Sequence, residues 1–211
     1  MMKKIITFIT LLCLLAVQSC RQDEKMNELR EDLQGKTELS QKETFRNLTT
    51  DSKVKIWESK LNQVLIQDLT KEQRVLVEAL KGEIKNMNSP TYNGVKLIEL
   101  GIALAKITPE NDYIKMVSSL ENYTTTKNVK IGKINNVFVV KDLENFLIRV
   151  KKRNKLIIEE SQSSGGITNK KPVCNCSWTC GMYGGVDDNC TASNGGCGFL
   201  WLQDCTGHIG Y

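Results

Sequence analysis

The chain has 211 residues, and its 29 Lys and Arg against 24 Asp and Glu give a formal net charge of +5 at pH 7. This mild basicity is spread along predicted helices and is not interleaved with aromatic residues, so nucleic acid is not expected as a partner. The sequence has one histidine and no phosphate loop, nucleotide fingerprint or paired-carboxylate motif, which argues against an enzyme and predicts no cofactor.

Residues 1–19 have the form of a signal peptide. Two lysines precede a largely apolar run at 5–17, which is too short to span a bilayer. The run is followed by Ser19 and Cys20, and a small residue before a cysteine in this setting resembles the lipobox of bacterial lipoproteins. That resemblance implies that Cys20 carries the lipid, including palmitate, and becomes the new N-terminus. The alternative is an ordinary secretory signal with an incidental cysteine.

Residues 20–50 are polar and contain few large apolar side chains, which predicts a flexible tether. Directly after Cys20 and Arg21, the segment Gln22-Asp23-Glu24 resembles the surface-export signal of lipoproteins in the Bacteroidetes group. The resemblance implies that the protein lies at the outer membrane or cell surface, with the membrane as a partner through the lipid on Cys20.

Residues 51–160 contain no cysteine and predict a small helical bundle, which makes the fold class mainly α. Apolar residues recur at helical spacing between Val54 and Leu65, and Thr50 or Asp51 is suited to cap the start of this helix. Trp57 lies on the apolar face, where a single large aromatic is expected to anchor the packing of the core.

A second helix is predicted to begin at the capping box formed by Thr70 and Gln73. The connection to the first helix is short, so the two are expected to form an antiparallel hairpin. Residues 95–107 are apolar nearly all round and predict a central, buried helix. Thr108 as N-cap and Pro109 as first helical residue then predict the start of another helix.

The end of the helical domain is less regular. Residues 137–140 are predicted either as a short strand or as the entry to a helix, and a final helix is predicted over 142–160. Residues 161–172 are rich in Ser and Gly and predict a flexible linker and a domain boundary. Within this linker, Gly165-Gly166 resembles the double-glycine cleavage point of bacteriocin leaders, and the alternative is an uncut linker.

Residues 173–211 predict a small disulfide-rich module. After removal of Cys13 with the signal peptide and lipidation of Cys20, six of the eight cysteines remain: Cys174, Cys176, Cys180, Cys190, Cys197 and Cys205. An even number of clustered cysteines in an exported protein is typical of a disulfide framework, because so short a segment cannot bury enough apolar surface alone. Their connectivity stays open.

A metal site is the alternative interpretation of the same cysteines. The spacing Cys-x-Cys-x3-Cys together with His208 offers soft ligands for zinc, but it lacks paired Cys-x2-Cys knuckles. Export also favours oxidation of thiols. No metal is therefore predicted, and Asp187-Asp188-Asn189 is interpreted as a turn because the other ligands of a calcium loop are missing.

Large apolar and aromatic side chains are dense in the tail. We predict an interaction patch that is partly exposed and faces a membrane interface or a protein partner. Its members are Trp178, Tyr183, Phe199, Leu200, Trp201 and Leu202. The alternative is that these side chains pack against the bridges or against the helical body.

Three features of the tail resemble the fulvocin C type of cysteine-rich bacteriocin. They are Cys174-Asn175-Cys176, Gly196-Cys197-Gly198 followed by an aromatic and apolar run, and Cys205-x-Gly207 near an aromatic C-terminus. The helical body before the tail resembles the N-terminal part of the long fulvocin-related proteins of Bacteroidetes. The resemblance implies an antimicrobial, bacteriocin-like module.

The predicted function is therefore that of a non-enzymatic, exported lipoprotein. It would present a bacteriocin-like, disulfide-rich module that acts by contact with the envelope of a target cell or with a protein partner. The alternative is a surface binding or assembly lipoprotein whose stapled tail is an interaction cap without toxicity.

Overall fold

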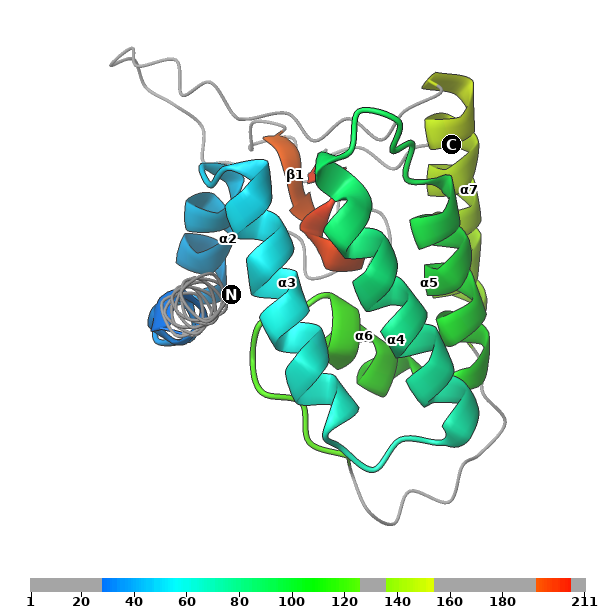
Figure 1. Cartoon of the computed structure of the whole chain (residues 1–211), viewed down its shortest axis with the longest axis horizontal. Coiled ribbons are helices and arrows are strands. Elements are labelled where there is room, and N and C mark those ends of the chain that lie inside the picture. Colours follow the sequence, from blue (N-terminus) through cyan, green and yellow to red (C-terminus); the bar gives the residue numbers. More distant parts are fainter. Residues whose placement is uncertain (1–27, 126–135, 154–192, 206–211) are drawn as a thin grey trace, which may run out of the picture.

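A computed structural model of the chain describes residues 28–125, 136–153 and 193–205, and these are mainly helical, as the sequence predicts (Figure 1). Residues 28–34 are helical. The further helices are α2 (Glu38–Arg46), α3 (Thr50–Leu65), α4 (Lys71–Lys85), α5 (Val95–Ile107), α6 (Glu110–Val117) and α7 (Val137–Arg153). Short 3-10 turns occur at η1 (Asn86–Asn88) and η2 (Phe199–Trp201), and the strands are β1 (Ser193–Cys197) and β2 (Gln203–Cys205).

The predicted flexible tether over 20–50 is wrong from residue 28 onward. Residues 28–34 and α2 are helical, and the side chain of Thr37 caps α2. Although this segment has few large apolar residues, Leu33 and Phe45 are both buried in the common core. Two well-placed apolar contacts thus anchor helices whose composition alone is typical of a solvated chain. Residues 20–27 lie outside the described residues.

The predicted hairpin of α3 and α4 is confirmed. The two helices pack side by side and run in opposite directions (Figure 1). Thr70 and Gln73 form the predicted capping box, with both reciprocal hydrogen bonds present. The cap of α3 is Thr49, one residue before the predicted Thr50 or Asp51, because Thr49 is the last residue with extended backbone.

Helix α5 contacts α4, α6 and α7, in agreement with its predicted central place. It ends at Ile107, and its C-cap residue Thr108 is extended, as expected for a residue that precedes a proline. Helix α6 then begins at Glu110, so Pro109 is its N-cap rather than its first helical residue. The hydroxyl of Thr108 instead accepts a hydrogen bond from Nε2 of Gln73 at 3.2 Å, which ties α5 to the start of α4.

Helix α7 begins at Val137, five residues before the predicted Asp142, so the helical alternative is correct for 137–140. The reason is periodicity: Val139 lies on the same buried face as Leu143, Phe146 and Val150, which packs against α5. The predicted continuation of this helix to 160 lies outside the described residues.

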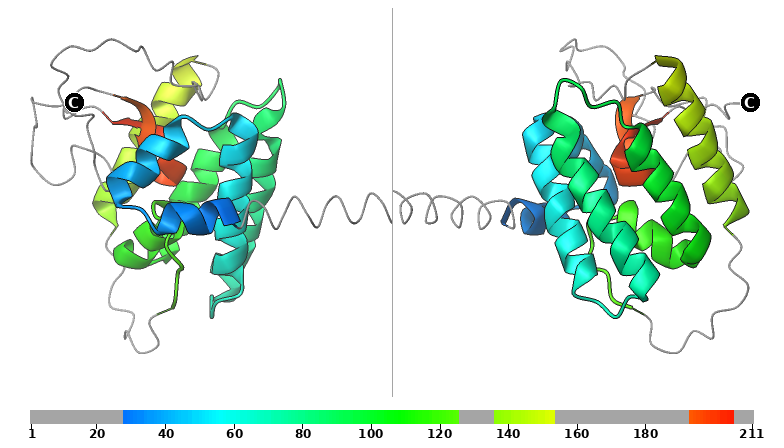
Figure 2. Two further views of the ribbon diagram at one scale, coloured as in Figure 1. Left: turned by 90° about the vertical axis from the view of Figure 1, so that its left-hand side faces the viewer. Right: turned by 45° about the vertical axis from the view of Figure 1, so that its right-hand side comes forward.

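The C-terminal hairpin, residues 193–205, is inserted among the helices. Strands β1 and β2 pair antiparallel with Cys197 opposite Gln203, and η2 forms the tip. Figures 1 and 2 show the hairpin between the α2–α3 side and the α5–α7 side of the bundle. Residues 199–202 belong to the same hydrophobic core as the helices, so the hairpin is not a separate module. The predicted boundary at 161–172 lies outside the described residues.

In the described part of the chain, none of the helices combines the length and the apolar character needed to cross a bilayer.

Two glycines inside helices provide a test of this packing. A Cβ at Gly101 in α5 would lie 2.7 Å from Cζ of the fully buried Phe199 ring, whereas a Cβ at Gly82 in α4 would meet nothing within 4 Å. Gly82→Ala should therefore stabilise the protein by roughly 0.5–1 kcal/mol through helix propensity. Gly101→Ala should lower the free energy of unfolding, because overpacking costs about 1–3 kcal/mol. Urea unfolding followed by circular dichroism measures both changes. A rise of the unfolding midpoint in both variants would contradict the docking of Phe199 on α5.

Candidate functional site

The side chain of Trp201 lies where three parts of the chain meet. Its ring is edge-on to Phe45 of α2, with centroids 5.1 Å apart, and edge-on to Trp57 of α3, at 5.7 Å. Phe45 and Trp57 are themselves edge-on at 6.4 Å. Each such aromatic pair contributes about 0.5–1.5 kcal/mol beyond the burial of area. Trp201 thus completes an aromatic cluster that Phe45 of α2 and Trp57 of α3 begin.

The indole of Trp201 also has a polar partner. Its Nε1–H donates a hydrogen bond of 3.0 Å to the backbone oxygen of Ser118, the residue that ends α6. Carbonyl groups at the end of a helix lack partners within the helix, and the indole N–H supplies a hydrogen bond to this one. Nε1 of Trp57, by contrast, is buried without a hydrogen bond. Trp201 is therefore fixed in position as well as buried.

The tip of the hairpin has an unusual backbone. Leu200 and Trp201 have φ angles of 52° and 54°, in the left-handed region that bulky side chains rarely adopt. Such conformations cost roughly 1–3 kcal/mol each and persist only where the surroundings determine them. Phe199, Leu200 and Trp201 are each at most 1% exposed, so their burial is what holds this backbone.

Glycines on both sides of Cys197 allow the hairpin to approach its neighbours. Gly196 has a φ of 92°, and a Cβ there would lie 2.5 Å from Nε of Arg46. Gly198 has a φ of 65°, and its Cβ would clash with the amide of Gln203. The Gly-Cys-Gly motif therefore has a local reason: one glycine contacts a guanidinium group of α2, and the other closes over the opposite strand.

The structure corrects the prediction of an exposed patch. Phe199, Leu200, Trp201 and Leu202 are between 0% and 8% exposed, and they pack in the core of the helical body. The sequence predicts exposure because a small module cannot bury all of these side chains, but the hairpin buries them in the larger core of the bundle. The alternative, packing against the body, is thus the observed arrangement for these four residues. Trp178 and Tyr183 lie outside the described residues.

The cysteines are only partly within the described residues. Cys197 is fully buried and disulfide-bonded. The backbone of Cys205 pairs with Ser193 across the hairpin. Outside the described residues lie Cys20, Cys174, Cys176, Cys180 and Cys190. Where side chains are described, no three His, Cys, Asp or Glu residues are grouped closely enough to hold a metal ion.

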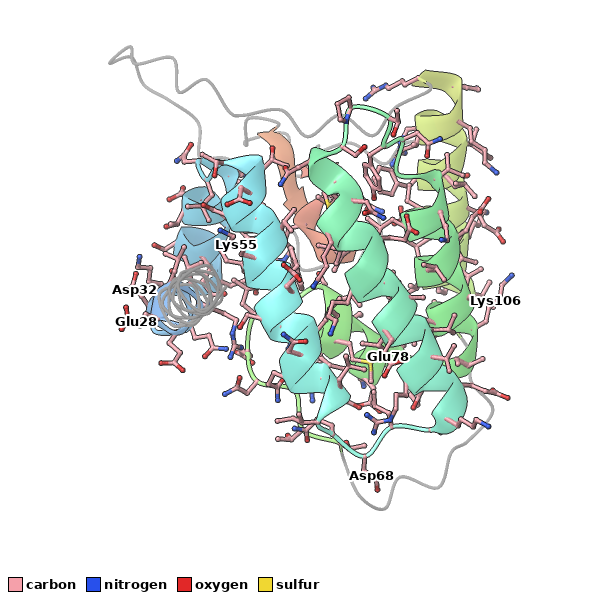
Figure 3. The ribbon with its side chains drawn as sticks, in the orientation of Figure 1. Glu28, Asp32, Lys55, Asp68, Glu78 and Lys106 are labelled. Atoms are coloured by element: carbon pink, nitrogen blue, oxygen red, sulfur yellow. The ribbon has the colours of Figure 1, made fainter. Side chains whose placement is uncertain are left out.

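Buried basic side chains are a feature that sequence reasoning missed. They come from residues 28–34, α2 and α3, and each is at most 7% exposed: Arg30, Lys42, Arg46, Lys53 and Lys60. No Asp or Glu whose side chain is described is comparably buried. Residues such as Asp32, Asp68 and Lys106 instead point away from the bundle (Figure 3). The only signal in the sequence was the repeated occurrence of basic residues near Leu33, Phe45 and Trp57.

One group of these side chains holds residues 120–123, which follow α6. Nη1 of Arg30 donates to Oδ1 of Asn122 at 3.1 Å, and Lys60 donates to the backbone oxygen of Glu121. Gln63 makes two hydrogen bonds with the backbone of Tyr123, at 2.6 and 2.9 Å. Residues 28–34 and α3 thus hold the segment that follows Ser118, whose backbone oxygen accepts the hydrogen bond from Trp201.

A small pocket of about 520 Å³ lies elsewhere, between the end of α5 and the start of α7. Asn136 in its wall donates hydrogen bonds to the backbone oxygens of Ala105 and Thr108, at 2.7 and 2.5 Å. Its Oδ1 is buried without a partner. The pocket contains none of the predicted site residues, so it has no part in the tail site.

Comparison with known proteins adds no assignment. No family model, curated protein or solved structure matches the chain. The resemblance to fulvocin-related proteins therefore stays a prediction from the motifs of the tail.

Lys60 gives a prediction for the pH dependence of stability. Burial, followed by the charge of Arg30, lowers the pKa of Lys60 from 10.5 to about 7, although Glu121 raises it. Between about pH 7 and 10.5 the unfolded state therefore binds more protons at this residue than the folded state, and stability should rise with pH across that window. Below about pH 7 Lys60 is charged in both the folded and the unfolded state, so the full cost of burying its charge remains.

The measurement is the urea unfolding free energy from pH 6.5 to 9.5. In Lys60→Met the rise with pH should be smaller than in the unmodified protein, whereas Lys152→Met, at an exposed residue of α7, should follow the unmodified protein. Parallel curves for all three proteins would show that Lys60 is not the group responsible.

Proposed function

We propose that this protein is a non-enzymatic, exported lipoprotein that acts by binding a partner, with the helical body and the C-terminal hairpin folded as one unit. The observation that supports the binding function over membrane disruption is the burial of Phe199, Leu200, Trp201 and Leu202. A run that forms part of the core is not available to insert into a bilayer, because its removal would leave a cavity between Phe45 and Trp57.

Export and lipid attachment rest on the N-terminal sequence. The charged start, the apolar run and Ser19-Cys20 together support cleavage before Cys20 and attachment of lipid to its sulfur. The disulfide of Cys197 fits the same scheme, since bridges persist mainly in oxidising compartments outside the cytosol. The proposal thus locates the protein at the outer membrane or cell surface, held through Cys20.

Partner contact is assigned to the part of the tail that precedes the hairpin. Residues 174–192 contain four of the six tail cysteines together with Trp178 and Tyr183. Tyr and Trp are enriched where proteins bind one another, because one side chain offers apolar area and a polar atom. In this scheme the docked hairpin holds the end of the tail, and the preceding segment meets the partner.

A bacteriocin-like activity is the second candidate, and the tail motifs favour it. Cys174-Asn175-Cys176 and Gly196-Cys197-Gly198 are the features shared with the fulvocin C type of peptide. In this candidate, residues 174–192 would act on the envelope of a target cell without use of the buried run. It predicts damage to a membrane or inhibition of neighbouring bacteria, which the binding function does not.

The lipid anchor can be tested with two cysteine substitutions. Cys20→Ser should move the protein from the membrane fraction to the soluble exported fraction, because the sulfur that carries the lipid is lost. Cys13→Ser is the matched control: Cys13 lies in the apolar run that is removed, so the mature protein should stay with the membrane. Cell fractionation and the intact mass of the mature chain report both. An intact mass of the unmodified mature chain that shows no lipid on Cys20 would contradict lipidation.

Dye release from vesicles separates the two candidates. Oxidised Cys20→Ser protein is added to vesicles of phosphatidylethanolamine and phosphatidylglycerol, with detergent lysis as the reference for full release. The binding function predicts no release above buffer, since the four apolar residues of the hairpin are buried. Release that depends on intact disulfides would overturn it in favour of the bacteriocin-like candidate.

A further inference from the structure

We propose that the helical body binds the segment 196–203 tightly enough to retain this segment when the chain that connects them is cut. The tail would then stay on the body after a cut anywhere between Arg153 and Ser193. This inference concerns the protein's own segment as ligand and does not depend on the lipid anchor or on an external partner.

The distribution of cysteines is the first step. Residues 21–173 contain no cysteine, and all six cysteines after residue 20 lie between Cys174 and Cys205. No disulfide can therefore join the body to the tail once Cys20 carries lipid or is replaced by serine. Apart from the connecting chain, everything that holds the hairpin in the bundle is noncovalent.

The second step is that the noncovalent contacts are numerous and specific. Trp201 fills the gap between Phe45 and Trp57 and hydrogen-bonds to Ser118, so its size and its N–H are both recognised. A buried indole with satisfied polar and apolar contacts is the kind of residue that dominates binding interfaces. Leu200 and Leu202 extend the same apolar contact.

Glycines on both the body and the hairpin allow the two to approach closely. Phe199 packs where α5 has Gly101, and any larger residue there would overlap the ring. On the hairpin, Gly196 lies against the guanidinium group of Arg46, where a Cβ would clash. The fit is therefore reciprocal, with a glycine of the body beneath an aromatic of the tail and a glycine of the tail against an arginine of the body.

The third step concerns the chain connection. Residues 154–192 separate α7 from β1, and closing so long a connection costs conformational entropy that the docking contacts must exceed. They must also exceed the strain of two bulky residues with positive φ at the tip. A connection of this length contributes only an effective concentration, so the contacts themselves carry the specificity.

The experiment uses the full mature chain with Cys20→Ser and a site-specific protease sequence inserted between Gly165 and Gly166. The folded, oxidised protein is cut, and the two fragments are followed by gel filtration and native mass spectrometry at micromolar concentration. We expect the fragments to elute together in buffer and apart in denaturant. Separate elution in buffer would overturn the proposal.

Variants show whether the site is the one described. Trp201→Phe keeps an aromatic ring but loses the hydrogen bond to Ser118, and it should raise the fraction of free tail several-fold. Trp201→Ala should raise it at least tenfold. Phe138→Ala, at an aromatic residue that is 70% exposed, is the control and should retain the tail.

Trp201→Ala and Trp201→Phe are first checked for folding as uncut chains by circular dichroism. If Trp201→Ala is unfolded before cutting, Trp201→Phe gives the answer alone. Equal retention of the tail in Trp201→Phe, Phe138→Ala and the parent would overturn the assignment of Trp201 as the anchor.

Discussion

The contact on which this fold depends is the insertion of Trp201 between Phe45 and Trp57, with its indole N–H donating to the backbone oxygen of Ser118, the residue directly after α6. The cluster joins the beginning, middle and end of the described chain, so the core is not complete until the C-terminal hairpin has docked. Contacts between residues so far apart in sequence slow folding, because a long loop must close before they form. The helices are thus made early in synthesis but receive their last core residues at its end.

The buried basic residues of the body also influence which tail can dock. Helix α2, which β1 contacts, buries Lys42 and Arg46, and burial lowers the pKa of both. The tail from residue 174 onward has no Lys or Arg and three Asp. Buried cations are costly to desolvate, so they are weak evidence for stability, but they discriminate strongly against a ligand of the same sign. Docking of an uncharged or acidic hairpin is therefore favoured over docking of a basic one.

Local signals explain which parts of the fold the sequence predicts. The capping box at Thr70, the break before Pro109 and the apolar face of α5 act within a few residues, and the helices lie close to where these signals place them. Residues 28–46 lack a strong local pattern of apolar residues. Leu33 and Phe45 become core residues only through partners that are distant in the sequence. Gly101 is a similar case. Glycine is unfavourable inside a helix, and its presence in α5 is explained only by the close contact with the Phe199 ring. The tail site is built from such distant contacts, which composition and periodicity do not reveal.

The error about the exposed patch has a general cause. The prediction treats the short cysteine-rich segment as a separate fold, which can bury only part of its large apolar side chains and leaves the others at the surface. Here these others enter the core of a larger body, and the disulfide-bonded Cys197 is buried with them. Thiol–disulfide exchange requires access to the sulfur that is attacked, so burial in the docked state protects the Cys197 sulfur. A bridge in turn reduces the freedom of the undocked tail and favours docking. Docking and oxidation therefore stabilise each other, and neither the helical body nor the cysteines alone account for the folded tail.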